Sequence, residues 1–559
     1  MLRWIAERYA DREAQVRGAR RITFRQLERR SAELARGLLA QGIGKGSRIA
    51  LLMPNGPDFT IAFMAAARIG AVVAPLSTLF KARELAWALR HGDFQMLMIA
   101  TRYLGHDYLA RLEEAFPTLA SQSAGRLALP EAPYLRSILT WGEAGGESER
   151  GWAAPGEASL CASAAAQPMI DEALLAAAEA SVTPADLLCM IFTSGSTAEP
   201  KAVVHTHGGV MRVGWQKSQV FWGVGAEGER LVSARPHFWV AGFAATLIQS
   251  LQTGSCLIDP DEHRSGADVV RLIETEGATA AGGDHAWIEG LTTDPALAAA
   301  GYAALITALE CVVFARRTPE GLRPLNPARA ARQPLIVPTP IEQFARSFGM
   351  TETLSAHTSI PAGEVMPPDR QGWCGRPMPG VALRLCDPAT GEVVERGEVG
   401  EVQVRGYNLM HGLYKKERSQ TFTADGWYRT GDLAVMDDDG YVKFYSRMGE
   451  MLKVKGANVA PAEVEERLNA QPQVLRSAVV GLPAGGDTLV AAAVELHPGH
   501  VFDEAALREA VKQELSSYKA PKRIFALKPE DFPLTSTGKI HKPTLARNLA
   551  AMLEAEGAV

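Results

Sequence analysis

Residues 190–201 read MIFTSGSTAEPK, a short apolar run followed by a hydroxyl-rich loop that ends on a lysine. The run 190–192 predicts a buried strand. Backbone N–H groups and Ser/Thr hydroxyls in the loop can donate to a polyphosphate, and Lys201 adds a compact positive charge. The loop lacks the G-x-x-x-x-G-K-[ST] pattern of a Walker A motif. Taken alone, it is equally an ordinary hydroxyl-rich turn. The phosphate-binding candidates are Thr193, Ser194, Gly195, Ser196, Thr197 and Lys201.

N-terminal to this stretch, helix and strand patterns alternate. Residues 23–41 repeat apolar side chains at helical spacing, and 48–53 (RIALLM) form a short buried strand. A second helix over 58–69 leads to a strand at 71–75. Such βαβ repetition predicts an α/β fold of parallel sheet covered by helices. Residues 118–170 are rich in Ala, Ser, Gly and Pro, and we expect a surface excursion there with little core of its own.

Beyond residue 380 the pattern changes to shorter strands punctuated by Gly and Asp, which predicts an antiparallel β subdomain. The last ~110 residues predict a small α+β domain ending in a Pro- and Lys-rich tail. Its expected elements are a helix at 463–470, strands at 474–481 and 488–496, and a helix at 503–515.

The composition excludes several protein classes. The chain has 559 residues, 47% of them hydrophobic and 22% charged, which excludes collagen, coiled coil, disorder and a disulfide scaffold. Its 58 basic and 63 acidic residues give a formal charge of −5. A slightly acidic chain has no bulk attraction for nucleic acid, so we expect no nucleic-acid partner and a local site for any phosphate.

Cysteine usage and the N-terminus indicate a cytoplasmic protein. The six cysteines form no C-x-x-C pair and are interpreted as core residues in a reducing compartment. The start MLRWIAERYADRE mixes charges of both signs, unlike a signal peptide. The apolar stretches 60–76 and 296–315 are each interrupted by a charged residue, so we expect no integral membrane segment.

Four further blocks follow the first in order: FGMTET (348–353), GWYRTGDL (426–433), Arg447 with KVKGAN (453–458) and PAEVE (461–465), and PLTSTGKI (533–540). In this order and spacing the five blocks resemble the adenylate-forming superfamily of acyl-CoA synthetases, luciferases and peptide-synthetase adenylation domains. The resemblance covers residues 23–547. Within the superfamily the chain looks most like fatty-acid, aryl and alicyclic acyl-CoA ligases.

The resemblance implies a two-step ligase reaction. ATP and a carboxylic acid give acyl-AMP and pyrophosphate, and a thiol, usually that of coenzyme A, then displaces AMP. It also implies an AMP-binding domain over 1–445 and a mobile C-terminal lid domain over 446–559. The cofactors and co-substrates would be ATP, Mg²⁺ and coenzyme A, the acid would be medium- to long-chain or bulky and cyclic, and a homodimer stays open.

Three catalytic residues follow from the resemblance. Lys539 would bridge the carboxylate and the α-phosphate, because joining two anions requires a cation between them. Thr351 would donate to the α-phosphate. Glu352 would hold Mg²⁺, since a carboxylate beside phosphates is a hard-oxygen ligand. A lone lysine in a polar tail is otherwise an ordinary solvated charge.

Nucleotide contacts are implied in three blocks. Phe348 would lie against the adenine, and Gly349 is assigned to the cofactor-binding group. Asp432 would accept the ribose hydroxyls, although an Asp after a glycine is also a common turn cap. Arg447 would pair with ribose or phosphate oxygens, and Lys453 is assigned to the same cofactor-binding group.

The acid site is implied less specifically. By register, Trp239 in PHFWVAG (236–242) falls where the family has a residue beside the acyl carboxylate, and its indole would offer an apolar wall and one donor. A core aromatic is the alternative. Gly283, with Trp287 and Leu354, is assigned to the acid pocket by family position.

The chain also departs from the family pattern. Ala198 and Ala202 replace glycines, the stretch 310–347 lacks a Gly-Gly-Ala-Pro adenine segment, Ser446 replaces a glycine before Arg447, and Gly449 stands at the hinge. Two alternatives to an acyl-CoA ligase therefore stay open. One is a catalytically degraded nucleotide-binding paralogue, and the other is an acyl-AMP ligase that loads a carrier protein.

Overall fold

The computed structural model describes residues 1–559 except 143–149, 194–199, 221–227, 261–264, 284, 309–310, 327, 329–346, 361–365, 455–456, 485–486, 516–518, 536–537 and 556–559. The chain divides into two compact units. The first comprises Met1–Thr193, Pro200–Ala382 and Arg405–Gly426. Among the described residues, the second comprises Leu383–Val404 and Trp427–Val559. The domain boundary expected between 445 and 446 stays a prediction.

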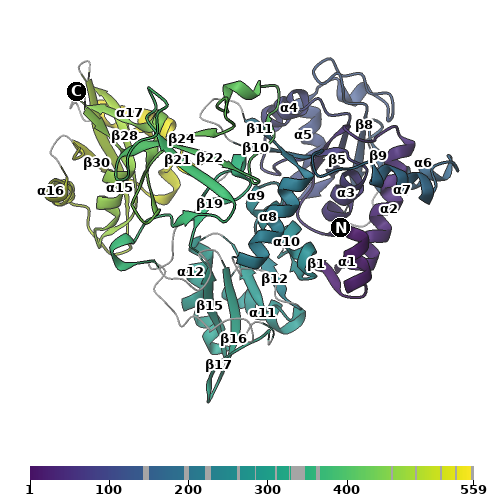
Figure 1. The fold of residues 1–559 in the computed structure, drawn as a ribbon, viewed down its shortest axis with the longest axis horizontal. Coiled ribbons are helices and arrows are strands. Elements are labelled where there is room, and N and C mark those ends of the chain that lie inside the picture. Colours follow the sequence, from purple (N-terminus) through teal and green to yellow (C-terminus); the bar gives the residue numbers. More distant parts are fainter. Residues whose placement is uncertain are drawn as a thin grey trace. The chain divides into compact units, whose positions relative to one another are not determined.

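Two eight-stranded sheets form the first unit (Figure 1). One has the order β23-β11-β10-β4-β3-β5-β8-β9. Its strands from β10 to β9 pair in parallel, as the βαβ pattern predicted, whereas β10 and β11 form an antiparallel hairpin. The bounds are β23 (Gly412–Leu413), β11 (Lys201–Thr206), β10 (Leu187–Thr193), β4 (Val72–Pro75), β3 (Arg48–Leu52), β5 (Met96–Ala100), β8 (Ser137–Trp141) and β9 (Ala154–Pro155).

The other sheet has the order β15-β16-β14-β12-β13-β1-β2, with β17 paired to β16. Strands β1, β13, β12 and β14 run parallel, so their carboxyl ends share one edge, which we call the β12–β14 edge. Ligands bind preferentially outside such ends. The bounds are β15 (Tyr302–Ala308), β16 (Cys311–Thr318), β14 (Ala280–Gly282), β12 (Arg230–Ser233), β13 (Cys256–Ile258), β1 (Glu13–Arg17), β2 (Arg20–Thr23) and β17 (Gly321–Pro324).

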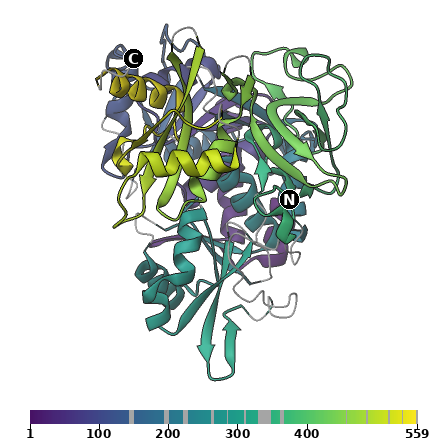
Figure 2. The ribbon, with the colours of Figure 1, turned by 90° about the vertical axis from the view of Figure 1, so that its left-hand side faces the viewer.

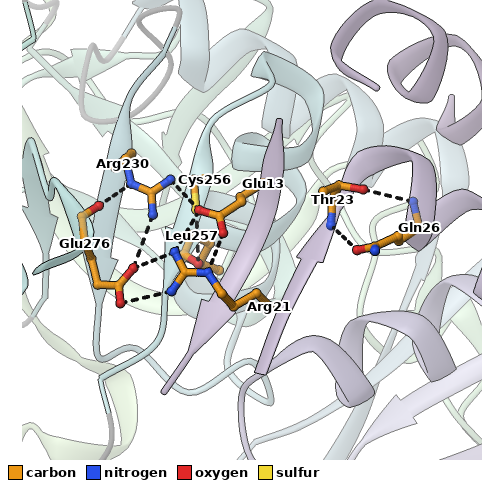
Figure 3. Close-up of polar contacts among 8 residues, drawn as sticks. All are labelled: Glu13, Arg21, Thr23, Gln26, Arg230, Cys256, Leu257 and Glu276. Carbon is orange, nitrogen blue, oxygen red and sulfur yellow. Dashed lines mark hydrogen bonds and ion pairs between the residues drawn. The ribbon is translucent and has the colours of Figure 1, made fainter. Parts of the chain in front are cut away.

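Helices cover these sheets, and the first long one shows how local sequence starts them. Helix α2 (Phe24–Ala40) begins at a capping box in which Thr23 and Gln26 exchange side chain–backbone hydrogen bonds (Figure 3). The other helices include α1 (Leu2–Tyr9), α3 (Pro57–Arg68), α4 (Ala82–His91), α5 (Tyr108–Ala115), α6 (Gly156–Ala165), α7 (Glu172–Ala180), α8 (His207–Val220), α9 (Val240–Gly242), α10 (Gln249–Thr253), α11 (Gly266–Glu276), α12 (His285–Thr293) and α13 (Pro295–Ala299).

The expectation of a coreless excursion at 118–170 is wrong. Strand β8 pairs with β5 inside the first sheet, and Ile138, Trp152 and Leu160 are buried. Leu160 on α6 packs so close to Gly37 of α2 that a Cβ at position 37 would overlap it. Small residues in this stretch permit close packing of helices. Composition alone did not distinguish a closely packed segment from a solvated loop.

An antiparallel sheet and a three-stranded α+β core make up most of the second unit. The first has the order β21-β22-β24-β25, and in the other β28 pairs antiparallel with β29 and β29 parallel with β30. Both agree with the predicted patterns. The bounds are β21 (Val381–Cys386), β22 (Val399–Gly406), β24 (Tyr428–Met436), β25 (Val442–Arg447), α15 (Pro461–Asn469), β28 (Val474–Ala484), β29 (Asp487–Leu496), α16 (Glu504–Glu514) and β30 (Arg523–Ala526).

The expected Pro- and Lys-rich tail instead contains helix α17 (Lys542–Ala555), drawn in yellow in Figure 2. Its residues Leu545, Leu549 and Leu553 recur at helical spacing and are buried against one face of the β28–β30 sheet. This amphipathic stripe was readable in the sequence and was missed.

The structure also bears on two further expectations, concerning membrane segments and cysteines. None of the described helices is long and apolar enough to cross a bilayer. Five of the six cysteines are buried as predicted, whereas Cys161 is exposed.

Candidate active site

The predicted phosphate loop is closed by the β10–β11 hairpin. Thr193 and Lys201 are direct partners in this antiparallel pair, so the two residues that flank the predicted loop lie side by side. Ser194, Gly195, Ser196 and Thr197 lie outside the described residues, as does Ala198. Ala202 is buried in the core and pairs in register with Phe192. The alanine at 202 therefore leaves the hairpin intact.

The FGMTET block forms a tight turn beside a short sheet. Strand β18 (Phe348–Gly349) pairs with β19 (Ala356–Ser359), and a Cβ on Gly349 would lie 2.5 Å from Ala356 Cα, so only glycine fits. A 3₁₀ turn over Thr351–Thr353 follows, in which Thr353 Oγ1 accepts from Met350 N at 3.1 Å. Thr351 and Glu352 are left half-buried at the surface of this turn.

A buried histidine joins this turn to the phosphate hairpin. His205, on β11, has its Nε2 2.9 Å from the Thr351 carbonyl oxygen. A carbonyl can only accept, so Nε2 carries the proton. Burial lowers the pKa of His205 to about 4, and the hydrogen bond to Thr351 opposes this only in part. The imidazole is therefore neutral at pH 7 and acts as a fixed donor.

The segment 408–414 makes a second connection between the same two elements. Asn408 Nδ2 donates to the Thr353 carbonyl at 3.2 Å, and Met410 N donates to the Glu352 carbonyl at 2.8 Å. His411 N and Tyr414 N bind carbonyls on β11. Together with His205, these residues hold Thr351 and Glu352 beside the strand that begins at Lys201. Sequence reasoning missed them, because an asparagine a few residues before a two-residue strand has the pattern of an ordinary turn.

Glu352 fits its predicted role toward Mg²⁺. Within the described residues, no three acidic, histidine or cysteine side chains gather as a metal cage. Mg²⁺ keeps several waters and usually binds one or two carboxylates together with phosphates. A single half-buried carboxylate next to the phosphate hairpin matches that donor set.

The predicted acid residues lie at the β12–β14 edge. Trp239 follows β12 and is half-buried, and Gly283 follows β14. Arg235 Nη2 donates to the Gly283 carbonyl at 2.6 Å, and a Cβ on Gly283 would overlap the ring of Trp287. The structure thus brings Trp239, Gly283 and Trp287 to one edge. Leu354, by contrast, is fully buried in the core of the first unit.

In the second unit, Asp432 and Arg447 form a pair. Arg447 Nε lies 2.9 Å from Asp432 Oδ1, and the carboxylate is buried whereas the guanidinium is half exposed. Thr430 Oγ1 accepts from Asp432 N at 3.0 Å and donates to the Val402 carbonyl at 2.7 Å. Ser446, which replaces the family glycine, is buried and donates to its neighbour's carbonyl. The GWYRTGD block is therefore held to the sheet by its own side chains.

Lys539 lies in a narrow turn. Thr535 N donates to the Lys539 carbonyl at 2.7 Å, Lys539 N donates to Thr535 Oγ1 at 3.2 Å, and Gly538 has φ +77. The side chain of Lys539 is exposed. Lys453 is paired with Asn458 through the β26 (Leu452–Val454) and β27 (Ala457–Val459) backbones, and its side chain lies outside the described residues.

Comparison with known proteins identifies the family. The AMP-binding enzyme family matches residues 2–414, and the AMP-binding enzyme C-terminal domain matches residues 463–539. The acyl-CoA ligase SID4 of Ajellomyces capsulatus is 30% identical over 98% of this chain and 90% of its own. The 3-hydroxybenzoate–CoA ligase of Aromatoleum sp. (strain CIB) is 27% identical over 98% of this chain and 95% of its own.

Solved structures share the fold. The anthranilate CoA ligase AuaEII in complex with anthranoyl-AMP matches with a TM-score of 0.74 at 23% identity, covering 99% of this chain and 98% of its own. The motif order, the two families matched and the shared fold lead to one conclusion. The chain belongs to the AMP-binding enzyme family and is an acid–thiol ligase of the adenylate-forming superfamily.

Proposed function

We propose that the chain is an ATP-dependent acyl-CoA ligase that activates a bulky cyclic or medium- to long-chain carboxylic acid, with Thr351, Glu352 and Lys539 as its catalytic residues. The observation that supports this best is the connection of the Thr351–Thr353 turn to the Lys201 hairpin through His205. A polyphosphate held at the hairpin would have a hydroxyl and a carboxylate beside it on a fixed backbone.

In the first step, a carboxylate oxygen of the acid attacks the α-phosphorus of ATP and pyrophosphate leaves. Both reactants are anions, so cations must offset their repulsion. Lys201 would hold the β- and γ-phosphates, and Lys539 would lie between the carboxylate and the α-phosphate. Mg²⁺ bound through Glu352 would supply further charge compensation. Thr351 would donate to an α-phosphate oxygen.

In the second step, the thiolate of coenzyme A attacks the acyl carbonyl, and AMP leaves with the bond electrons on its phosphate oxygen. Asp432 and Arg447 would keep the adenosine in place through both steps, since a carboxylate accepts from two ribose hydroxyls. Lys453 is assigned to the same cofactor-binding group.

The acid class rests on the β12–β14 edge and on the relatives. Trp239 and Trp287 offer flat apolar surfaces, which suit a ring or an alkyl chain better than a short polar acid. Relatives are named 3-hydroxybenzoate–CoA ligase, feruloyl-CoA synthase and medium-chain acyl-CoA ligase. We propose a cytoplasmic location, which the low cysteine content without a C-x-x-C pair favours.

The test is a panel of carboxylic acids assayed for acid-dependent ATP–pyrophosphate exchange, then for thioester formation with free coenzyme A or a holo-carrier protein. We expect exchange with aromatic or medium-chain acids and thioester formation with free coenzyme A. Thioester formation only on the carrier protein would favour an acyl-AMP ligase. ATP binding by folded protein without exchange for any acid would favour a degraded paralogue.

A further inference from the structure

The side chain of Asn55 is hydrogen-bonded to both sides of the segment that carries Trp239. Its Nδ2 donates to the Arg235 carbonyl at 2.8 Å, and its Oδ1 accepts from His237 N at 2.8 Å. Pro236, between them, has no N–H to offer. An amide is the side chain that can donate and accept from one planar group. Asn55 therefore fixes both peptide units that flank Pro236.

Asn55 reaches this segment from the other sheet. It follows β3 in the turn Pro54–Asn55–Gly56 that starts helix α3, and Gly56 has φ +140, which favours glycine. Arg17 Nη1 donates to the Asn55 carbonyl at 3.1 Å. Strand β3 lies in the same sheet as the β10–β11 hairpin. Asn55 thus links the sheet of the phosphate hairpin to the β12–β14 edge.

A buried polar cluster lies beside the same segment. His237 and Asp259 are buried, with His237 Nε2 3.6 Å from Asp259 Oδ1. Gln15 Nε2 donates to Asp259 Oδ2 at 2.6 Å, and Thr60 Oγ1 donates to Gln15 Oε1 at 2.6 Å. Burial lowers the pKa of His237 to about 3, so the imidazole is neutral at pH 7.

One member of this cluster lies on the helix that follows Asn55. Thr60 lies on α3, the helix that begins immediately after the turn of Asn55. The His237 ring packs on Phe59 of the same helix, with ring centroids 5.1 Å apart. His237 is therefore held at its backbone N–H by Asn55, while its ring, which makes no hydrogen bond, packs against Phe59.

The fixed segment determines where Trp239 and Gly283 lie. Trp239 N donates to the Pro236 carbonyl at 3.1 Å. The N–H of that same peptide unit, on His237, donates to Asn55. The turn that carries Trp239 therefore starts on a peptide unit that Asn55 holds. Arg235, whose carbonyl Asn55 holds, donates from its side chain to Gly283. A displacement of the backbone at 235–237 would therefore also displace Trp239 and Gly283, the two predicted acid residues.

We infer that Asn55 is a positioning residue for acid recognition, acting through the backbone of 235–237 on Trp239 and Gly283. The inference rests on the proposed function of these residues in the acid pocket. Asn55 itself is not placed in contact with the acid. Its loss would loosen the acid site while leaving the nucleotide residues of the hairpin in place, because none of the latter is among its hydrogen-bond partners shown here.

The experiment compares Asn55→Ala and Asn55→Asp with the unmodified chain in acid-dependent pyrophosphate exchange. We expect Asn55→Ala to raise KM for the acid about tenfold and to change KM for ATP less than about twofold. Gln122→Ala is the matched control, since Gln122 Oε1 also accepts from a backbone N–H, that of Ala128 in a surface loop. That control should leave both KM values unchanged.

Two further measurements distinguish positioning from general destabilisation. In a Trp239→Ala background, the effect of Asn55→Ala on the acid KM should fall below about twofold, because coupled residues are not additive. Amide exchange at His237 should accelerate in Asn55→Ala and stay protected in Asn55→Asp, whose carboxylate still accepts. Equal rises in both KM values, full additivity, or unchanged exchange at His237 would each overturn the inference.

The exchange measurement needs no activity. If no acid supports turnover by the unmodified chain, the proposed function fails, and exchange at His237 still decides whether Asn55 holds the segment. If turnover is normal and only the acid KM is unmoved, the positioning role fails while the proposed function stands.

Discussion

Asp432 and Arg447 lie directly opposite each other in the β24–β25 ladder, with Arg447 Nε 2.9 Å from Asp432 Oδ1. The carboxylate is 1% exposed and the guanidinium 51% exposed. Strand β24 fixes the backbone of the buried Asp432, and the exposed guanidinium of Arg447 orients its carboxylate. Such a pair holds the carboxylate oxygens in a constant direction, which the proposed recognition of two ribose hydroxyls would require.

Replacing Arg447 by alanine should raise KM for ATP about tenfold, because the ion pair with Asp432 and its orienting effect are lost. The loss in stability should be about 1 kcal/mol, since the guanidinium is half exposed and solvent screens the pair. Initial rates against ATP and urea unfolding measure the two effects. Lys443→Ala is the control on the same strand, where the lysine pairs with the exposed Glu466 at 3.5 Å. An ATP KM unchanged in Arg447→Ala would remove Arg447 from the nucleotide site.

Lys539→Ala should reduce acid-dependent pyrophosphate exchange by at least about 10²-fold, because it removes the cation proposed to lie between the two reacting anions. The fold should be unaffected, since the turn is held by the Lys539 backbone and Thr535. Thioester formation from synthetic acyl-AMP and coenzyme A should persist, which localises the defect to the first step. Lys528→Ala, also an exposed lysine of this unit, should behave as the unmodified chain. Equal loss in both half-reactions would contradict the assignment.

His205 should contribute to acid unfolding. Its pKa is lowered from 6.5 to about 4 in the folded chain, so the unfolded chain takes up the proton first as pH falls. The stability it contributes is complete above pH 6.5 and is lost as pH falls toward 4. His205→Gln, whose amide can still donate to Thr351, should therefore make the free energy of unfolding less dependent on pH between these values. Urea unfolding at several pH values measures the slope, with the exposed His497→Gln as control. An unchanged slope would show that His205 is not buried neutral.

An ion network around the β1–β2 hairpin predicts a second pH dependence (Figure 3). Arg21 binds Glu13 and Glu276, and Arg230 binds the same two acids. The hydrogen bond from Arg21 is the largest cause that lowers the pKa of Glu13 from 4.5. The stability from Glu13 is therefore present above pH 4.5 and lost as pH falls through its lowered pKa.

Glu13→Gln should cost about 1 kcal/mol at pH 7 in low salt, and the difference from the unmodified chain should close on acidification and shrink in high salt. Thermal unfolding across pH and salt measures it. Glu33→Gln, which removes the exposed i,i+4 pair with Arg29, should cost less. A deficit that persists at pH 3 would show that packing, not charge, is responsible.

The order of motifs and the local elements were readable from the sequence. The capping box at Thr23, the apolar period of α2 and the hairpin strands of the second unit each depend on residues within a few positions of one another. Helical spacing and capping are properties of the nearby chain, so sequence patterns specify them. Helix α17 had the same kind of pattern and could have been predicted.

The connections that position the site were decided only by the tertiary structure. Asn55 and His237 are 182 residues apart, and His205 and Thr351 are 146 apart. No local pattern encodes which distant carbonyl a buried amide or imidazole will meet, because that depends on how two sheets pack and on which polar groups burial leaves to be satisfied. The sequence by itself determined the family, the expected chemistry and the elements whose patterns are local. Only packing of the folded chain determined that Asn55, His205 and Asn408 hold the segments on which that chemistry depends.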